Sequence, residues 1–107
     1  MSGSQNELPL SETQFLIMAS LITPAHGYGI MQNVESMTEG RVAIGPGTMY
    51  GTLKKLLKRH HITQLDQDTR RIRYVLTESG RKLLNLETDR LRMLAAIGDK
   101  LNTEDVG

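Results

Sequence analysis

The sequence predicts an α+β protein that is mainly α-helical and carries a small β hairpin. Four segments place apolar residues at helical spacing, with residues at their ends that start or stop helices. Two short segments rich in β-branched residues flank a polar turn at residues 66–70, as the strands of a hairpin do. The positive charge of the chain is concentrated in residues 41–82, which include the third helical segment and this hairpin.

Length and composition limit the protein to one small domain. A chain of 107 residues, 38% hydrophobic and 23% charged, holds one core, and an oligomer would add apolar burial. The chain has no Cys, which excludes disulfides, thiolate metal sites and a Cys nucleophile. The longest apolar run, residues 15–19, is far shorter than the roughly 20 residues of a membrane span. No basic segment precedes an apolar one at the N-terminus, so we expect no signal peptide and a cytoplasmic protein.

The first helix is predicted to begin with a capping box. Residues 11–14 read Ser-Glu-Thr-Gln, in which the Ser hydroxyl and the Gln side chain satisfy free backbone amides. The helix is apolar nearly all round, which indicates a central and buried position. Because a proline disfavours helical geometry in the residue before it, Pro24 should end this helix near Thr23. Residues 1–8 precede the domain and are expected to be disordered.

The second helix is predicted to follow a turn at residues 26–29, His-Gly-Tyr-Gly. Its apolar residues share one helical face, and they are Ile30, Met31, Val34 and Met37. Gly40 should end this helix. Residues 41–44, Arg-Val-Ala-Ile, favour a short strand.

The third helix is predicted to start at residues 45–48, Gly-Pro-Gly-Thr, and to run to about His60. At roughly 100° per residue, its apolar face comprises Met49, Leu53, Leu56 and Leu57. The opposite face is small and basic, and it comprises Gly47, Gly51, Lys54, Lys55 and Lys58, with Thr48 at its edge. Tyr50 lies at the flank, where it either packs half-buried or presents its hydroxyl to a phosphate.

A hairpin is predicted to follow, with strands at residues 62–65 and 72–76. Three arginines lie at or near its tip, namely Arg70, Arg71 and Arg73. Thr77 is the expected N-cap of a last helix at residues 78–101, which would be about 36 Å long. Residues 102–107 are expected to be a frayed tail.

The charge distribution is the strongest indication of function. Residues 41–82 hold ten Lys or Arg against three Asp or Glu, a net +7. Residues 1–40 have four Glu and no Lys or Arg, a net −4. Residues 83–107 have three basic and five acidic residues, a net −2. A nearly neutral protein that gathers its cations in one segment is suited to a polyanionic partner, because each neutralised phosphate releases condensed counterions.

This order of elements is that of a winged helix-turn-helix with a long C-terminal dimerisation helix. The winged domain would cover residues 9–76 and the dimerisation helix residues 77–101. In such a fold the third helix enters the major groove of DNA, and the hairpin wing reaches a neighbouring run of phosphates. The charge distribution agrees, because the cations lie on these two elements.

Three stretches of the sequence resemble the PadR family of bacterial transcriptional regulators in its short form. They are residues 21–29 (LITPAHGYG), 40–53 (GRVAIGPGTMYGTL) and 73–80 (RYVLTESG). The resemblance implies a homodimeric repressor that binds a pseudo-palindromic DNA operator and dimerises through its last helix. In many family members a small-molecule effector releases the DNA. The resemblance also implies DNA contacts from Thr48, Tyr50 and the wing arginines.

The sequence departs from the family pattern in places. The wing keeps its charge but lacks a glycine and one aromatic residue, and residues 58–61 are more basic than the turn that the family favours. Some relatives bind flat aromatic drugs between tryptophans at the dimer interface. This chain has no Trp and one Phe, so the sequence gives no support to that mode of binding.

Two sets of candidate functional residues follow. The predicted DNA-binding residues are Gly47, Thr48, Tyr50, Gly51, Thr52, Lys54, Lys55, Lys58, Arg70, Arg71 and Arg73. The predicted dimerisation residues are Leu84, Leu91, Leu94, Ile97 and Leu101, and the contribution of the first helix to a dimer stays open.

Other functions have less support. The main alternative is a winged-helix module for protein–protein interaction, which would bind an acidic protein and show no sequence preference on DNA. RNA binding is disfavoured because exposed aromatic residues are scarce. His26 is interpreted as structural, and the adjacent His60 and His61 make a poor chelate. No nucleophile–base pair, metal-ligand set or phosphate-binding loop is recognisable, so we predict no catalysis, no cofactor and no metal.

Overall fold

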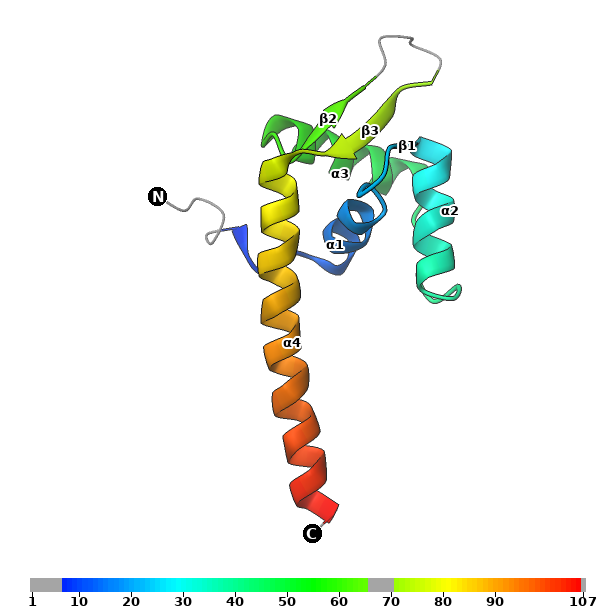
Figure 1. Ribbon diagram of the computed structural model, residues 1–107. Coiled ribbons are helices and arrows are strands. Elements are labelled where there is room, and N and C mark those ends of the chain that lie inside the picture. Colours follow the sequence, from blue (N-terminus) through cyan, green and yellow to red (C-terminus); the bar gives the residue numbers. More distant parts are fainter. Residues whose placement is uncertain (1–6, 66–70, 107) are drawn as a thin grey trace.

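The computed structural model describes residues 7–65 and 71–106, with side chains as far as residue 102. This part forms four helices, which are α1 (Glu12–Ala19), α2 (Gly27–Met37), α3 (Pro46–Lys58) and α4 (Glu78–Val106). It also forms three strands, which are β1 (Ala25–His26), β2 (Ile62–Gln64) and β3 (Arg73–Leu76). The strands make an antiparallel sheet in the order β1-β3-β2 (Figure 1). The predicted α+β class, with a wing and a long last helix, is confirmed.

Local sequence signals set several of the helix boundaries. The capping box at the start of α1 is present, because the Gln14 amide donates to the Ser11 hydroxyl at 3.0 Å and the Ser11 amide donates back to the Gln14 side chain at 3.2 Å. Pro46 occupies the first turn of α3, where a missing amide hydrogen has no cost. Thr77 caps α4, since its hydroxyl accepts a hydrogen bond from the Gly80 amide at 3.1 Å.

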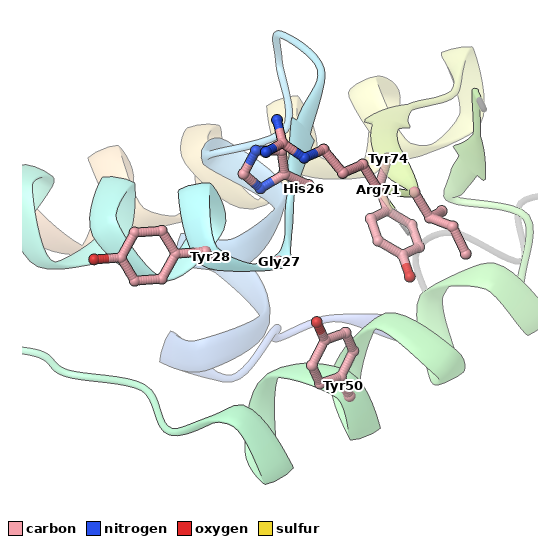
Figure 2. A pocket seen from close by; sticks show the side chains of 7 residues that line it. His26, Gly27, Tyr28, Tyr50, Arg71 and Tyr74 are labelled. Atoms are coloured by element: carbon pink, nitrogen blue, oxygen red, sulfur yellow. The ribbon is translucent and has the colours of Figure 1, made fainter. Parts of the chain in front are cut away.

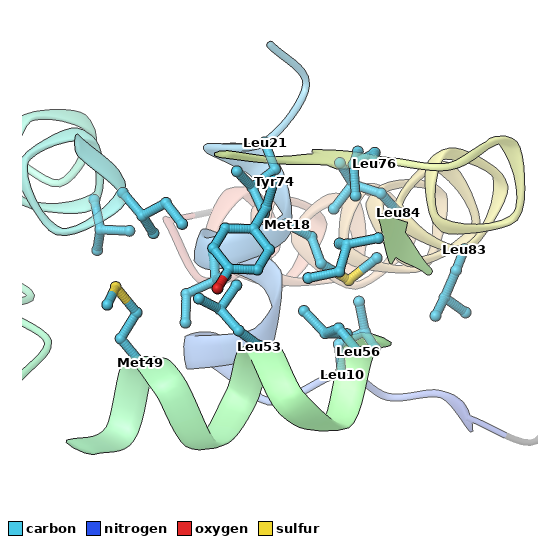
Figure 3. Close-up of a cluster of buried hydrophobic side chains, with 14 residues drawn as sticks. Leu10, Met18, Leu21, Met49, Leu53, Leu56, Tyr74, Leu76, Leu83 and Leu84 are labelled. Atoms are coloured by element: carbon cyan, nitrogen blue, oxygen red, sulfur yellow. The ribbon is translucent and has the colours of Figure 1, made fainter. Parts of the chain in front are cut away.

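The hydrophobic core lies where α1, α2, α3, the start of α4 and the sheet meet. From α1 it takes Ile17 and Met18, which are fully buried. Alternation along β3 turns Tyr74 and Leu76 into this core and leaves Arg73 exposed. Figure 3 shows Leu53 and Leu56 of α3 reaching up toward these two strand residues. The apolar face predicted for the third helix therefore points inward, and its basic face points out.

The first helix is shorter than predicted, because α1 ends at Ala19 rather than near Thr23. The Ser20 hydroxyl donates to the Ile17 carbonyl at 2.7 Å, at the helix end. Just past the end of α1, the Leu21 carbonyl accepts a hydrogen bond from the Leu76 amide of β3 at 2.9 Å. Helix α1 therefore ends upstream of Pro24, because the chain at Leu21 already bonds to β3.

The short strand lies in a different place from the one predicted. Residues 41–44 form no strand, and the Val42 amide donates instead to the Thr38 hydroxyl at 3.0 Å, which holds this loop against the end of α2. The sheet gains β1, in which Ala25 pairs with Tyr74 and His26 with Arg73. Of the turn predicted at residues 26–29, His26 is therefore strand, and the other three residues belong to α2, which begins at Gly27.

The last helix is longer than predicted, and residues 7 and 8 of the N-terminal segment have defined positions. The last helix continues beyond Leu101 to Val106, so the segment predicted to fray is helical as far as it is described. Of the predicted disordered segment 1–8, residues 1–6 lie outside the described residues. The Glu7 carboxylate, however, lies 2.9 Å from the imidazole of His61. Leu10 belongs to the core.

Helix α4 has a buried half and an exposed half. Its first turns bury Leu83, Leu84 and Glu87 against the rest of the protein. Beyond Leu91 the helix extends away from the other elements (Figure 1). This second half leaves five large apolar residues at exposures of 39 to 60%, and they are Leu91, Met93, Leu94, Ile97 and Leu101.

Candidate nucleic-acid interface

The outer face of α3 is basic and open. Met49, Leu53 and Leu56 anchor this helix in the core. The predicted contact residues Gly47, Thr48, Tyr50, Gly51, Lys54, Lys55 and Lys58 are all exposed, and Thr52 is half-buried. The fold therefore brings three lysines and the glycine-rich start of α3 together on one accessible surface. Two glycines on this surface leave room for another backbone to approach.

The wing supplies a second group of cations. Arg71 and Arg73 are exposed beside and within β3. Arg70 and the predicted turn at residues 66–70 lie outside the described residues. The register of the hairpin pairs Ile62 with Leu76 and Gln64 with Tyr74. Figure 1 shows β2 and β3 at the end of the molecule opposite the C-terminal end of α4.

A tight joint connects the end of α3 to the start of α4. The Thr77 hydroxyl donates to the His60 carbonyl at 2.7 Å, and the Thr77 amide donates to the His61 carbonyl at 3.0 Å. Gly80 lies so close to this joint that a Cβ there would overlap the His61 carbonyl oxygen. His60 takes a positive φ of 63°, which turns the chain sharply after α3. The orientation of α3 is thus tied directly to that of α4.

The side chain of His61 reinforces this joint from inside. It is 3% exposed and lies between the Ser79 hydroxyl, 2.9 Å from Nδ1, and the Glu7 carboxylate, 2.9 Å from Nε2. Glu7 also forms an ion pair with Arg59, the C-cap of α3, at 3.2 Å. No local signal in the sequence indicated this cluster, because its members come from three distant segments.

A recess of about 470 Å³ lies between the start of α2, α3 and β3, next to the basic face (Figure 2). Its lining includes His26, Tyr28, Tyr50, Arg71 and Tyr74. Tyr50 and Arg71 were predicted as contact residues, but nothing in the sequence placed them in one recess with His26. The motif of residues 26–29 was the available signal, since it brings a histidine and a tyrosine to a helix start.

Two of the three tyrosines that line the recess, Tyr50 and Tyr74, come from α3 and β3. Tyr74 is 7% exposed, and its burial raises the pKa of the phenol, with a smaller contribution in the same direction from Tyr50. Tyr50 is 52% exposed, and Figure 2 shows its ring rising from α3 toward Gly27. A Cβ at position 27 would overlap the Tyr50 hydroxyl, so the glycine is what permits this approach. Tyr50 therefore approaches the start of α2 with its hydroxyl while the residue as a whole stays half exposed.

The predicted dimerisation residues fall into two groups. Leu84 is 6% exposed in the core of the single chain, so its burial needs no partner. The other four lie on the exposed half of α4. Beside Leu91 there is a groove of about 390 Å³ between α1 and α4, which Phe15 and Leu16 help to line.

In the described part of the chain, no group of three or more His, Cys, Asp or Glu side chains could hold a metal ion. None of the helices in residues 7–65 and 71–106 combines the length and apolar character needed to cross a membrane.

Relatives of known sequence span more than this chain. The transcriptional regulator YqjI of Escherichia coli (strain K12) is 29% identical over 70 residues, which are 65% of this chain and 34% of that protein. A 37.1 kDa protein of transposon TN4556 from Streptomyces fradiae is 31% identical over 86 residues, 79% of this chain and 24% of that protein. The chain thus spans about a quarter to a third of the length of these relatives.

Solved structures share the fold. A transcriptional regulator from Clostridium thermocellum superimposes with a TM-score of 0.71 at 22% identity, covering 81% of this chain and 86% of that one. PadR of Bacillus subtilis, in complex with operator DNA, has a TM-score of 0.60 at 26% identity, covering 72% of this chain and 46% of that one. The sequence also matches the model of the PadR-like transcriptional regulator family over residues 16–86. The chain belongs to the PadR-like family of transcriptional regulators.

Proposed function

We propose that this protein is a homodimeric repressor that binds a pseudo-palindromic DNA operator with sequence specificity. The observation that carries the proposal is the basic face of α3, on which Lys54, Lys55 and Lys58 are all exposed. The wing arginines add charge beside it, and most of the acidic residues of the chain lie elsewhere. The operator DNA bound to the Bacillus subtilis relative supports this reading of the surface.

The proposed contacts are of two kinds. Contacts to phosphates would position the protein on the DNA, and contacts to base edges would read the sequence. The start of α3, with Gly47 and the Thr48 hydroxyl, would hold a backbone phosphate through amide and hydroxyl groups. Thr52 and Lys55 would face base edges in the major groove, since Lys55 is exposed and Thr52 is half-buried beside it. Lys54, Lys58 and the arginines Arg70, Arg71 and Arg73 would neutralise phosphates on either side.

The exposed half of α4 is the proposed dimer contact. The four predicted dimerisation residues on it would be buried against a second copy, and the groove beside Leu91 offers the first helix a part in that contact. Two-fold symmetry would then present two α3 helices about 34 Å apart, one turn of B-DNA. A small-molecule effector that changed the angle between the two copies would change this spacing and release the operator.

The proposal is tested by fluorescence anisotropy with a labelled fragment from upstream of the protein's own gene. A scrambled fragment of equal length is the control, and both are titrated at two salt concentrations. We expect tight binding to the upstream fragment alone, with an affinity that falls steeply as salt rises. Equal and weak binding to both fragments would show a basic surface without specificity on this fragment, and selection from random sequence would then be used to seek another operator.

The same titration separates the alternative function. A winged-helix module for protein–protein interaction would show no sequence preference on DNA, and we expect it to bind neither fragment at low salt. That result would overturn the proposal and favour an acidic protein as the partner, because the basic face would still need an anionic surface.

A further inference from the structure

The segment before α1 is held at both of its ends. At one end the Glu7 carboxylate lies 2.9 Å from Nε2 of His61, and at the other the Leu10 amide donates to the Glu87 carboxylate at 3.1 Å. Figure 1 shows this segment, in blue, beside the first turns of α4. Residues 7–10 thus form an N-terminal strap, which connects the turn after α3 to a point about 2.5 turns along α4.

Both contacts of the strap are largely buried. The side chain of His61 is buried, and that of Glu7 is 22% exposed. Because a carboxylate only accepts hydrogen bonds, Nε2 of His61 donates to Glu7, while Nδ1 is satisfied by the Ser79 hydroxyl. Glu87, at the other end of the strap, is 1% exposed. Breaking a hydrogen bond in such a place leaves an unsatisfied buried group, so both ends of the strap are strongly held.

His61 is the residue through which the strap reaches the joint between α3 and α4. Its amide donates to the Leu56 carbonyl of α3 at 2.9 Å, and its carbonyl accepts the Thr77 amide at 3.0 Å. Its side chain adds the strap through Glu7. The same carboxylate pairs with Arg59 at the end of α3, at 3.2 Å. Glu7 therefore supports the point from which both helices take their direction.

The second contact of the strap bears on the angle between these helices. A joint at one point fixes where two helices meet better than it fixes the angle between them. The strap contacts α4 again at Glu87, about 12 Å along the helix from Ser79, and so resists a change in that angle. The 13 residues of α3 span about 20 Å, so a rotation of about 10° at its end would move its start by about 3.5 Å, more than the length of a hydrogen bond.

We infer that the N-terminal strap is a positioning element, which sets the angle between α3 and α4 and thereby the separation of operator half-sites that the dimer accepts. The inference rests on the proposed function. Glu7 and His61 contact no DNA in this arrangement and act through α3. In a two-fold dimer joined by α4, a change in the angle occurs in both copies and alters the distance between the two α3 helices.

The first test varies the spacing of the operator, once footprinting or selection has identified it. Affinity is measured for operators whose half-sites are one or two base pairs closer or further apart. The wild type should bind the neighbouring spacings about tenfold more weakly, because the half-sites no longer match both α3 helices. Glu7→Ala removes the acceptor at His61, and this preference should fall below about threefold. Glu7→Gln keeps a carbonyl oxygen there and should retain most of the preference.

Glu12→Ala is the matched control. Glu12 lies at the exposed start of α1, so its loss changes the net charge by the same amount near the same end of the chain. Both alanine variants should gain some affinity at every spacing through the lost negative charge, but Glu12→Ala should keep the spacing preference of the wild type. Thermal unfolding checks that Glu7→Ala is folded. If it is not, Glu7→Asp decides, because it keeps the charge, falls one methylene short of His61 and should weaken the preference likewise.

A second measurement needs no DNA. Because the chain has no Cys, Lys54→Cys on α3 and Arg92→Cys on α4 can carry two spin labels, whose separation is measured by pulsed electron paramagnetic resonance. An excess of unlabelled protein removes the contribution of labels in a second copy. The distance should be narrowly distributed with the strap intact and with Glu7→Gln, and it should be broader or displaced with Glu7→Ala.

The outcomes distinguish the inference from the proposed function. If the wild type prefers no DNA sequence, both are overturned. If it binds a specific operator but accepts all spacings equally, only the role of the strap is overturned. The same holds if Glu7→Ala, or Glu7→Asp in its place, keeps the spacing preference or the label distance of the wild type. A preference that is lost in Glu7→Ala, restored in Glu7→Gln and kept in Glu12→Ala would establish the strap as a positioning element.

Discussion

Glu87 and Arg90 pair through two hydrogen bonds, of 2.6 and 2.8 Å, where α4 leaves the core of the protein. The Glu87 side chain is buried, and its carboxylate also accepts the Leu10 amide at 3.1 Å. The hydrogen bonds from Arg90 are the main reason why the pKa of Glu87 lies below its ordinary value, and they outweigh the burial that would raise it. This carboxylate therefore ties the segment before α1 to the last helix.

Glu87→Gln should destabilise the protein by about 1 to 3 kcal/mol at neutral pH, because charge-assisted hydrogen bonds in a buried place are lost. The contribution of Glu87 also depends on pH. A carboxyl whose folded pKa is lowered stabilises the fold above its ordinary pKa of 4.5, and this stabilisation is lost as the pH falls through the folded pKa. Urea unfolding from pH 7 down to pH 3 should show a shallower acid loss in the variant.

Asp89→Asn is the matched control for this prediction. Asp89 pairs with Arg92 on the same helix at 3.2 Å, but both side chains are at least 70% exposed. Removing an exposed pair should change stability by less than about 1 kcal/mol. Equal effects of the two substitutions would contradict the role assigned to Glu87.

Gly80→Ala should cost about 2 kcal/mol or more, because the new methyl group would overlap the His61 carbonyl and force α4 away from α3. Gly98→Ala, on the same helix, has nothing within 4 Å of the added carbon. It should stabilise the helix by about 0.5 to 1 kcal/mol through lower backbone entropy in the unfolded chain. Circular dichroism during thermal unfolding measures both, and a tolerated Gly80→Ala would refute the close approach.

Lys55→Glu should weaken operator binding by at least about tenfold without changing the unfolding temperature. Lys55 is exposed on α3 and makes no packing contribution to the core, so the change acts on the DNA surface alone. Arg92→Glu reverses a charge on the distant half of α4 and should leave affinity nearly unchanged. Anisotropy titrations with the upstream fragment compare the two, and undiminished binding by Lys55→Glu would show that the recognition surface lies elsewhere.

Leu94→Glu should convert the proposed dimer into monomers, since it places a charge in the middle of the exposed apolar row. Ala96→Glu introduces the same charge about 200° further around the helix and should leave the dimer intact. Sedimentation velocity gives the mass of each variant. Monomers in both cases, or dimers in both, would exclude this row as the contact.

Much of the fold was predictable because its signals are local. A Ser and a Gln three residues apart set the start of α1, and Thr77 set the start of α4. The period of the apolar residues in α3 identified which face is buried. These features depend on neighbours within one or two helical turns, and the sequence displays such neighbours directly.

The parts that were missed depend on distant partners. Strand β1 has only two residues, and it exists because Tyr74 and Arg73 pair with it from much later in the chain. The burial of Glu87 could not be read from its helix, since its partner Leu10 lies 77 residues away. The recess at Tyr50 likewise requires three elements to meet, and no spacing within one element reports such a meeting.

Because the joint at Thr77 ties α3 to α4, a small tilt of the long helix would displace α3. Helix α4 has 29 residues, which at 1.5 Å per residue makes it about 44 Å long. If the far end is held, a tilt of about 5° moves the near end by about 4 Å, slightly more than the rise of one base pair. A small change in the tilt of α4 far from the proposed DNA-binding surface would therefore displace that surface by about one base pair.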